Sequence, residues 1–150
     1  MRSVPKSDPP VEKLTSKSLK RAYNIMHVEM FKLFKNREIT VAQFDLLETI
    51  LLSENQALSI QDLASKTISL QPNITRMVSE LEKAGLVTRS SGTDRRTVIV
   101  QLTKKGEQLV ADIQKPLLEL HLSQYKMLNR EELCMLNDVL VKIYSNSDNI

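Results

Sequence analysis

The sequence predicts a mainly α-helical protein that also contains a small β-hairpin, an α+β fold. Long stretches are rich in Ala, Leu, Lys, Glu and Gln, which favour helices. With 3 glycines and 5 prolines in 150 residues, a fold of many strands and tight turns is disfavoured. One helix is expected to end at Gly85, and the next to begin after Thr103. Between them, residues 86–91 and 97–102 form strands around the charged turn 92–96. This order of elements is typical of a winged helix-turn-helix.

The composition predicts a soluble protein of one domain, or of one small domain with an extension. Its hydrophobic content of 41% and charged content of 26% are ordinary for a globular protein. No run of 18 apolar residues is present, so no membrane-spanning helix is expected. Residues 1–10 contain three prolines and no apolar core, which predicts a disordered tail and not a signal peptide. Because Cys134 is the only cysteine, no intramolecular disulfide can form. Together these features favour the cytoplasm.

The first half of the chain predicts three helices. Apolar residues recur at helical spacing over 11–35. The sequence Thr40-Val41-Ala42-Gln43 has the pattern of a capping box, which predicts that a second helix begins there. Residues 53–57 are expected to form a polar loop, after which Ser59 caps a short third helix.

The next predicted helix, over about residues 70–84, has two chemically different sides. Apolar residues form one stripe, which consists of Leu70, Ile74, Met77, Val78 and Leu81. Ser69 is the expected N-cap, and Gly85 is expected to end the helix in a left-handed conformation. Together with the short helix before it, this segment makes a helix-turn-helix, whose second helix enters the major groove of DNA.

The hairpin is followed by two more predicted helices. Thr103 is expected to cap a long helix over about 104–127, which Pro116 should kink or divide. A last helix is expected over about 130–145. The sequence thus predicts a winged helix region over 38–103 and a helical dimerisation region over 11–36 plus 104–145. The terminal helices are too long and apolar for a winged core of about 65 residues, so a homodimer is favoured over one larger monomeric core.

Two groups of polar residues are candidates for contacts with double-stranded DNA. The candidates on the major-groove helix can contact base edges and phosphates. They are Gln71, Pro72, Asn73, Thr75, Arg76, Ser79 and Lys83. At the tip of the hairpin, Arg96 is the first choice for the minor groove and Arg95 the second, with Asp94 orienting the turn or the arginines. Residues 59–106 carry eight Lys/Arg against four Asp/Glu, the densest positive excess of the chain.

The same segments resemble the MarR family of transcription regulators. The pattern Asp-x-Arg-x-x-x-(Val/Ile)-x-Leu-Thr-x-x-Gly is filled by Asp94, Arg96, Val100, Leu102, Thr103 and Gly106. Residues 40–47, 73–76 and 81–87 are similar to the second helix, the recognition helix and the exit strand of that family, and the resemblance covers roughly residues 14–145. It implies an obligate homodimer that binds short pseudo-palindromes, most often as a repressor. In many members, a small molecule or an oxidant releases the DNA.

Several possible switches remain open at this level. A small-molecule effector could bind beside the first helix at Tyr23, Met26, His27 and Met30, which offer apolar and polar groups. The only histidines are His27 and His121, and their spacing gives no metal motif, although Glu29 or Glu119 could join them. Cys134 lies among apolar and acidic residues, which favours a buried structural cysteine over a redox sensor.

No catalytic motif is present, and no cofactor or metal is expected. The alternative to a DNA-binding regulator is a winged-helix module that binds a protein. Such a module should expose apolar residues where this chain has Arg76, Lys83, Arg95 and Arg96.

Overall fold

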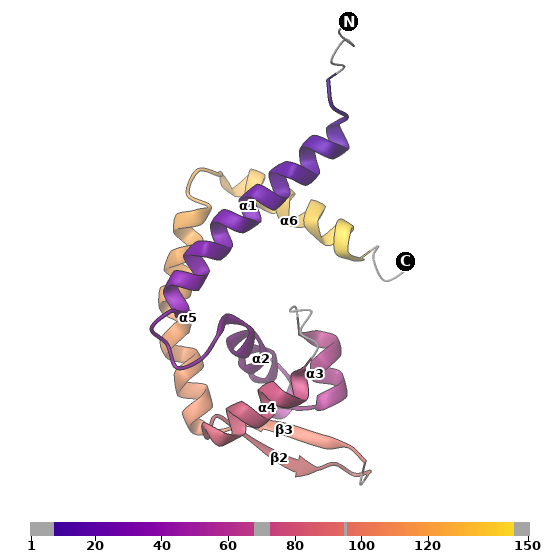
Figure 1. Ribbon diagram of the computed structural model, residues 1–150, viewed down its shortest axis with the longest axis vertical. Helices are drawn as coiled ribbons and strands as arrows, with labels where there is room; N and C mark the ends of the chain where they lie inside the picture. The colour runs from indigo at the N-terminus through magenta and orange to yellow at the C-terminus, as the bar shows by residue number, and fades with distance from the viewer. Residues whose placement is uncertain (1–7, 68–72, 95, 146–150) are drawn as a thin grey trace, which may run out of the picture. The chain divides into compact units, whose positions relative to one another are not determined.

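The computed structural model describes residues 8–67, 73–94 and 96–145. It confirms a mostly helical fold with one small antiparallel sheet (Figure 1). The helices are α1 (Val11–Phe34), α2 (Val41–Leu51), α3 (Ile60–Lys66), α4 (Ile74–Lys83), α5 (Lys104–Gln124) and α6 (Arg130–Ser145), with a short 3-10 turn, η1 (Glu54–Gln56). The strands are β1 (Ala57–Ser59), β2 (Val87–Ser91) and β3 (Val98–Leu102).

The chain divides into two compact units, Met1–Asp112 and Ile113–Ile150. The first unit holds α1 to α4, the sheet and the beginning of α5. The second unit holds the rest of α5 and all of α6. In the described part of the chain, no helix is both long and apolar enough to cross a membrane.

The beginnings of α2 and α3 confirm the predicted caps. The Thr40 hydroxyl accepts the Gln43 backbone N–H at 3.2 Å, and the Gln43 Oε1 accepts the Thr40 backbone N–H at 3.0 Å. This reciprocal pair is a capping box, which satisfies two helix-end donors at once. Ser59 caps α3 by accepting the Asp62 backbone N–H at 3.0 Å.

The core of the first unit forms around α2. Its apolar side chains are buried, and they are Phe44, Leu46, Leu47 and Ile50. Phe34 at the end of α1 packs on Phe44 with ring centroids 5.5 Å apart in a tilted arrangement, which is favourable for aromatic pairs. From α4, Ile74, Val78 and Leu81 are buried as the apolar stripe predicted.

The sheet has three strands in the order β1-β3-β2, all antiparallel. Val100 in the central strand pairs with Leu58 on one side and with Arg89 on the other. The sequence predicted β2 and β3 but treated residues 53–57 as loop, so β1 was missed. A strand of three residues carries too little alternation to be recognised, and its pairing with β3 spans about forty residues of sequence.

The start of α4 differs from the prediction, whereas its end agrees. The helix begins at Ile74, four residues later than expected, and its N-cap is Asn73, whose Oδ1 accepts the Arg76 backbone N–H at 3.2 Å. Ser69, the predicted cap, lies outside the described residues. Gly85 has φ +74°, and the Gly85 and Leu86 amides donate to the carbonyls of Glu82 and Leu81. These two bonds form a Schellman motif, for which a left-handed glycine is suited.

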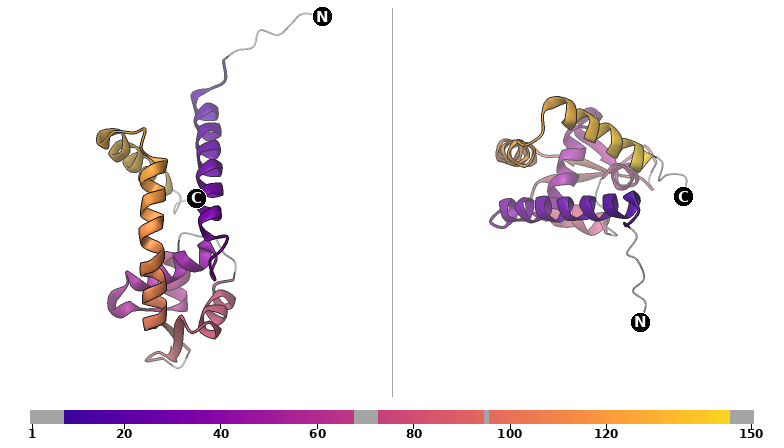
Figure 2. Two further views of the ribbon diagram at one scale, coloured as in Figure 1. Left: turned by 90° about the vertical axis from the view of Figure 1, so that its left-hand side faces the viewer. Right: turned by 90° about the horizontal axis from the view of Figure 1, so that it is seen from above.

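The last two helices follow the predicted order, and of the two effects expected of Pro116 the division of the helix does not occur. Helix α5 is not divided at Pro116 but continues to Gln124, as Figure 2 shows. A proline removes one hydrogen bond from the helix ladder, and the bonds of the adjacent residues keep α5 continuous. Helix α6 begins at the predicted residue because Asn129 and Glu132 exchange side-chain to backbone hydrogen bonds, each 2.9 Å long.

Candidate nucleic-acid interface

Helix α4 presents a polar face to solvent. Thr75, Arg76 and Lys83 are exposed, and Ser79 is half-buried. The opposite, apolar stripe holds the helix against the core, so the polar face is available without a cost in packing. Among the described residues of α4, no large apolar side chain is exposed.

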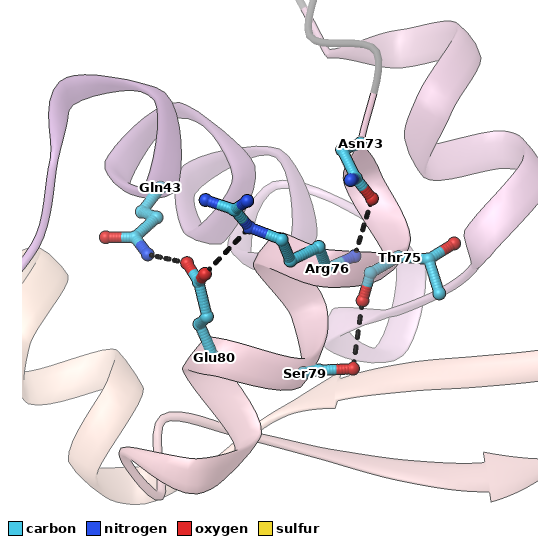
Figure 3. A network of polar contacts seen from close by, with 6 residues as sticks. All are labelled: Gln43, Asn73, Thr75, Arg76, Ser79 and Glu80. Atoms are coloured by element: carbon cyan, nitrogen blue, oxygen red, sulfur yellow. Dashed lines mark hydrogen bonds and ion pairs between the residues drawn. The ribbon is translucent and has the colours of Figure 1, made fainter.

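Arg76 is held by a carboxylate one turn further along α4 (Figure 3). Its Nε donates to Glu80 Oε1 at 3.0 Å, and the Arg76 side chain keeps 73% of its surface exposed. The other oxygen of the carboxylate, Glu80 Oε2, accepts from Gln43 Nε2 at 3.1 Å. A chain of three side chains therefore connects the beginning of α2 to the exposed face of α4.

A second network connects α4 to the hairpin. The Ser79 hydroxyl donates to the Thr75 carbonyl at 3.0 Å and accepts from Arg89 Nη1 at 3.3 Å. Arg89, in β2, also donates from Nε to Glu82 Oε2 at 2.8 Å, and its Nη2 lies 2.6 Å from the same oxygen. The hydrogen bond from the Arg89 guanidinium holds the pKa of the Glu82 carboxyl below its ordinary value.

The tip of the hairpin is shaped by backbone bonds and one carboxylate. The Gly92 amide donates to the Thr97 carbonyl at 2.8 Å, and the Thr97 amide donates to the Asp94 carbonyl at 2.9 Å. Asp94 Oδ1 accepts the Arg96 backbone N–H at 3.1 Å, and Arg96 itself is exposed. An Asx-type bond of this kind fixes the turn and leaves the arginine side chain unconstrained. Figure 1 shows the hairpin beside α4, projecting beyond it.

The beginning of α5 is tied to the end of α4. The Thr103 hydroxyl donates to the Gly85 carbonyl at 2.7 Å and accepts the Gly106 amide at 3.0 Å, which is the predicted cap of α5. Lys105 Nζ donates to the Ala84 carbonyl at 2.7 Å. A Cβ atom at residue 106 would overlap the Leu86 carbonyl oxygen, so glycine is required for this close approach. These contacts hold the base of the hairpin against the end of α4.

A domain with this helix pair and hairpin matches a known family. The MarR family model matches residues 39–98, which include α2 to α4 and the hairpin up to the start of β3. The HTH-type transcriptional regulator FarR of Neisseria gonorrhoeae is 37% identical over 99 residues, 65% of this chain and 68% of FarR. The chain belongs to the MarR family. This MarR family member is a transcriptional regulator and not an enzyme.

Solved structures agree with the MarR family assignment. Sco3205, a MarR family regulator from Streptomyces coelicolor solved in complex with DNA, has a TM-score of 0.84 and 18% identity. The alignment covers 97% of this chain and 92% of Sco3205. NadR, solved in complex with 4-hydroxyphenylacetate, has a TM-score of 0.69 and 30% identity, over 95% of this chain and 97% of NadR.

Within this MarR family fold, the structure groups part of the predicted interface. Helix α4 carries Thr75, Arg76, Ser79 and Lys83, and Asn73 uses its side chain as the N-cap. Gln71, Pro72 and Arg95 lie outside the described residues.

The sequence analysis missed four residues that hold this interface in place, namely Gln43, Glu80, Glu82 and Arg89. The spacing of Arg76 and Glu80 by four residues was a usable signal for an ion pair on a helix. The contacts of Gln43 with Glu80 and of Arg89 with Glu82 join different elements, so no local sequence pattern predicts them.

The residues predicted to bind an effector lie together on α1. The rings of Tyr23 and His27 stack with centroids 5.3 Å apart and an interplanar angle of 17°. Met26 and Met30 are half-buried, whereas Tyr23 and His27 are exposed. These four residues remain a predicted site.

The prediction that Cys134 is buried is wrong for the single chain. Cys134 is exposed, and α6 has no buried residue in the part of the chain that the structure describes. The reason is that this chain covers α6 only in part: Met135 and Leu136 are exposed and Leu133 is half-buried. The described residues contain no group of three or more His, Cys, Asp or Glu that could hold a metal ion.

Proposed function

We propose that this MarR family regulator is a repressor that binds a pseudo-palindromic site on double-stranded DNA as a homodimer. The observation that carries the proposal is the exposed polar face of α4 beside an arginine-tipped hairpin, both fixed to one core. The complex of Sco3205 with DNA supports it, because that protein has the same fold.

In this proposal, α4 lies in the major groove and Arg96 enters the minor groove. Arg76 suits guanine, whose O6 and N7 accept two hydrogen bonds, and Thr75 suits a thymine methyl or a phosphate. Lys83, at the end of the helix, suits a phosphate. The negative potential of a narrow minor groove favours an inserted arginine such as Arg96. Gln71, Pro72, Asn73, Ser79 and Arg95 complete the proposed contact set, with Asp94 supporting the turn.

The homodimer is proposed to form through residues 11–36 and 104–145. In the single chain, α1 exposes large apolar side chains, including Tyr23, Ile25 and Phe31, each more than half exposed. Leu118 and Leu122 on α5 and Ile143 on α6 are also more than half exposed. Exposed apolar surface of this extent is typical of protein interfaces. A two-fold dimer would place two copies of α4 on successive half-sites about 34 Å apart.

We also propose that a small molecule weakens DNA binding. NadR in complex with 4-hydroxyphenylacetate supports a phenolic ligand, since it is 30% identical over nearly the whole chain. The stacked rings of Tyr23 and His27, with Met26 and Met30, offer aromatic, polar and polarisable groups for such a ligand. A regulator of this kind would work in the cytoplasm.

The test is selection of bound sites from random DNA duplexes, followed by fluorescence anisotropy on the selected duplex at fixed salt. Enrichment of a two-fold symmetric sequence, with loss of affinity in Arg76→Ala, supports the proposal. Failure to enrich any duplex above the starting pool would reject it and favour the protein-binding alternative. Titration of phenolic acids, including 4-hydroxyphenylacetate, into the complex tests the effector. Placing the selected site before a reporter promoter tests the sign of regulation.

A further inference from the structure

We infer that Glu80 is a positioning residue that sets the base preference of Arg76. The inference rests on the proposed function, in which Arg76 reads the major groove. It adds a role for a residue that is itself negatively charged and lies on a surface proposed to face DNA.

The geometry leaves one edge of the Arg76 guanidinium for the ligand. Nε is occupied by Glu80 Oε1 at 3.0 Å, and within the described residues Nη1 and Nη2 make no hydrogen bond or ion pair (Figure 3). Two terminal nitrogens presented side by side match the O6 and N7 acceptors of guanine. Because Nε is already held, Arg76 offers its two terminal nitrogens to a base, and its side chain loses less rotamer freedom on binding.

Gln43 fixes the carboxylate that holds Arg76. The Gln43 amide has only one possible orientation, because its Oε1 accepts the Thr40 backbone N–H in the capping box. Its Nε2 must therefore donate, and Glu80 Oε2 accepts at 3.1 Å. Residue 80 needs two acceptors, one for Arg76 and one for Gln43, and an ionised carboxylate supplies both. An amide at position 80 supplies only one.

The charge of Glu80 has a second effect. A carboxylate near the DNA surface repels phosphates, so it weakens binding to every sequence. It also competes with phosphates for Arg76, which without Glu80 could turn towards the backbone. In the wild type, both effects are expected to lower the affinity for non-specific DNA and to increase discrimination between DNA sequences. Unfavourable contacts contribute to specificity in this way.

The experiment compares the wild type with Glu80→Ala, Glu80→Gln, Gln43→Glu, Arg76→Ala and the double variant Arg76→Ala/Glu80→Ala. For each protein, sites are selected from random duplexes. Affinity is then measured for the wild-type consensus, for duplexes with each G·C pair replaced by A·T, and for a scrambled duplex at several salt concentrations. Thermal unfolding and light scattering establish that each variant is folded with the wild-type mass.

Glu80→Ala should lose at least about fivefold of the discrimination for guanine at one position of each half-site, because a bidentate contact is worth about 1–3 kcal/mol. Its affinity for the scrambled duplex should rise, with a salt slope steeper by about one unit. Glu80→Gln should show a smaller rise in non-specific affinity and keep more of the guanine preference, because it removes the charge while its Oε1 can still accept from Arg76.

Gln43→Glu separates positioning from helix stability. A glutamate at position 43 keeps the capping-box acceptor for Thr40 but replaces the donor to Glu80 by a second carboxylate. We expect reduced guanine preference with little change in the unfolding midpoint. In the Arg76→Ala background, Glu80→Ala should cause no further loss of base preference.

Two failures are distinguishable. If Glu80→Ala is folded and keeps the full guanine preference while Arg76→Ala loses it, the role of Glu80 is overturned and the proposed function stands. If Arg76→Ala keeps the wild-type consensus, the assignment of Arg76 as a base-reading residue fails, and the inference fails with it.

Discussion

Arg96 combines a fixed backbone with a free side chain. Its amide is bound by Asp94 Oδ1 at 3.1 Å, while the side chain is exposed at the tip of the hairpin. We expect Arg96→Ala to weaken binding to the selected duplex by about 1–3 kcal/mol, since a groove contact of an arginine is lost. Fluorescence anisotropy at fixed salt checks this. Arg37→Ala, which removes an exposed arginine in the turn after α1, is the matched control. Equal affinities of the two variants would argue against the minor-groove role.

Gly106 shows how a residue without a side chain sets the geometry of the interface. Its position at the beginning of α5 leaves no space for a Cβ next to the Leu86 carbonyl and the Leu102 side chain. Gly106→Ala should lower the free energy of unfolding by about 1–3 kcal/mol, because overpacking forces the backbone to shift. Chemical denaturation measures the change. Gly92→Ala is a milder comparison, since its nearest contact at 3.1 Å is a Thr97 side chain. A Gly106→Ala protein as stable as the wild type would contradict the close approach.

At the scale of elements, the bond between Arg89 and Glu82 joins β2 to α4 and depends on pH. The folded pKa of Glu82 is lowered from its ordinary value of 4.5, mainly by the hydrogen bond from Arg89. The bond therefore contributes its full stabilisation above that ordinary value. This contribution begins to be lost when the pH falls below 4.5, and it is fully lost once the pH lies below the lowered folded pKa.

Chemical denaturation between about pH 6 and about pH 3 measures this dependence. The free energy of unfolding of the wild type should decrease more than that of Glu82→Gln, which has no carboxyl to titrate at this position. Arg89→Gln should behave like Glu82→Gln, because it removes the cause of the shift. Parallel curves for the wild type and both variants would show that the pair does not contribute.

At the scale of the whole molecule, the exposed apolar side chains of α6 predict association. Ile143 is 55% exposed in the single chain, and Val139 on the same helix is 47% exposed. Ile143→Lys should shift the mass measured by light scattering from twice the chain mass towards 17.1 kDa, because a charge placed in an apolar interface loses its hydration. Leu52→Lys adds the same charge at an exposed apolar residue outside the proposed dimer region and should remain dimeric. A wild-type protein of 17.1 kDa in solution would reject the dimer.

Local signals in the sequence predicted most element boundaries correctly. The caps at Thr40, Ser59 and Thr103 were predictable because each hydroxyl accepts a backbone N–H only three residues further along the chain. Gly85 was readable because few other residues adopt a left-handed helix end. The start of α4 was misplaced because Ser69 and Asn73 are both suitable caps, and local propensity does not choose between them.

The sequence by itself indicated the family, through the resemblance of residues 40–47, 73–76, 81–87 and 94–106 to its motifs. It also determined the polar face of α4 and the basic turn of the hairpin, because side-chain periodicity and capping are local properties of the chain. Only the tertiary structure decided which residues hold that face in place. Gln43 lies 37 residues from Glu80, and Thr103 lies 18 residues from Gly85. Such contacts depend on how α2, α4 and α5 pack together. The exposure of Cys134 is likewise a property of the folded chain, since neighbouring residues in sequence do not show which side of α6 is covered.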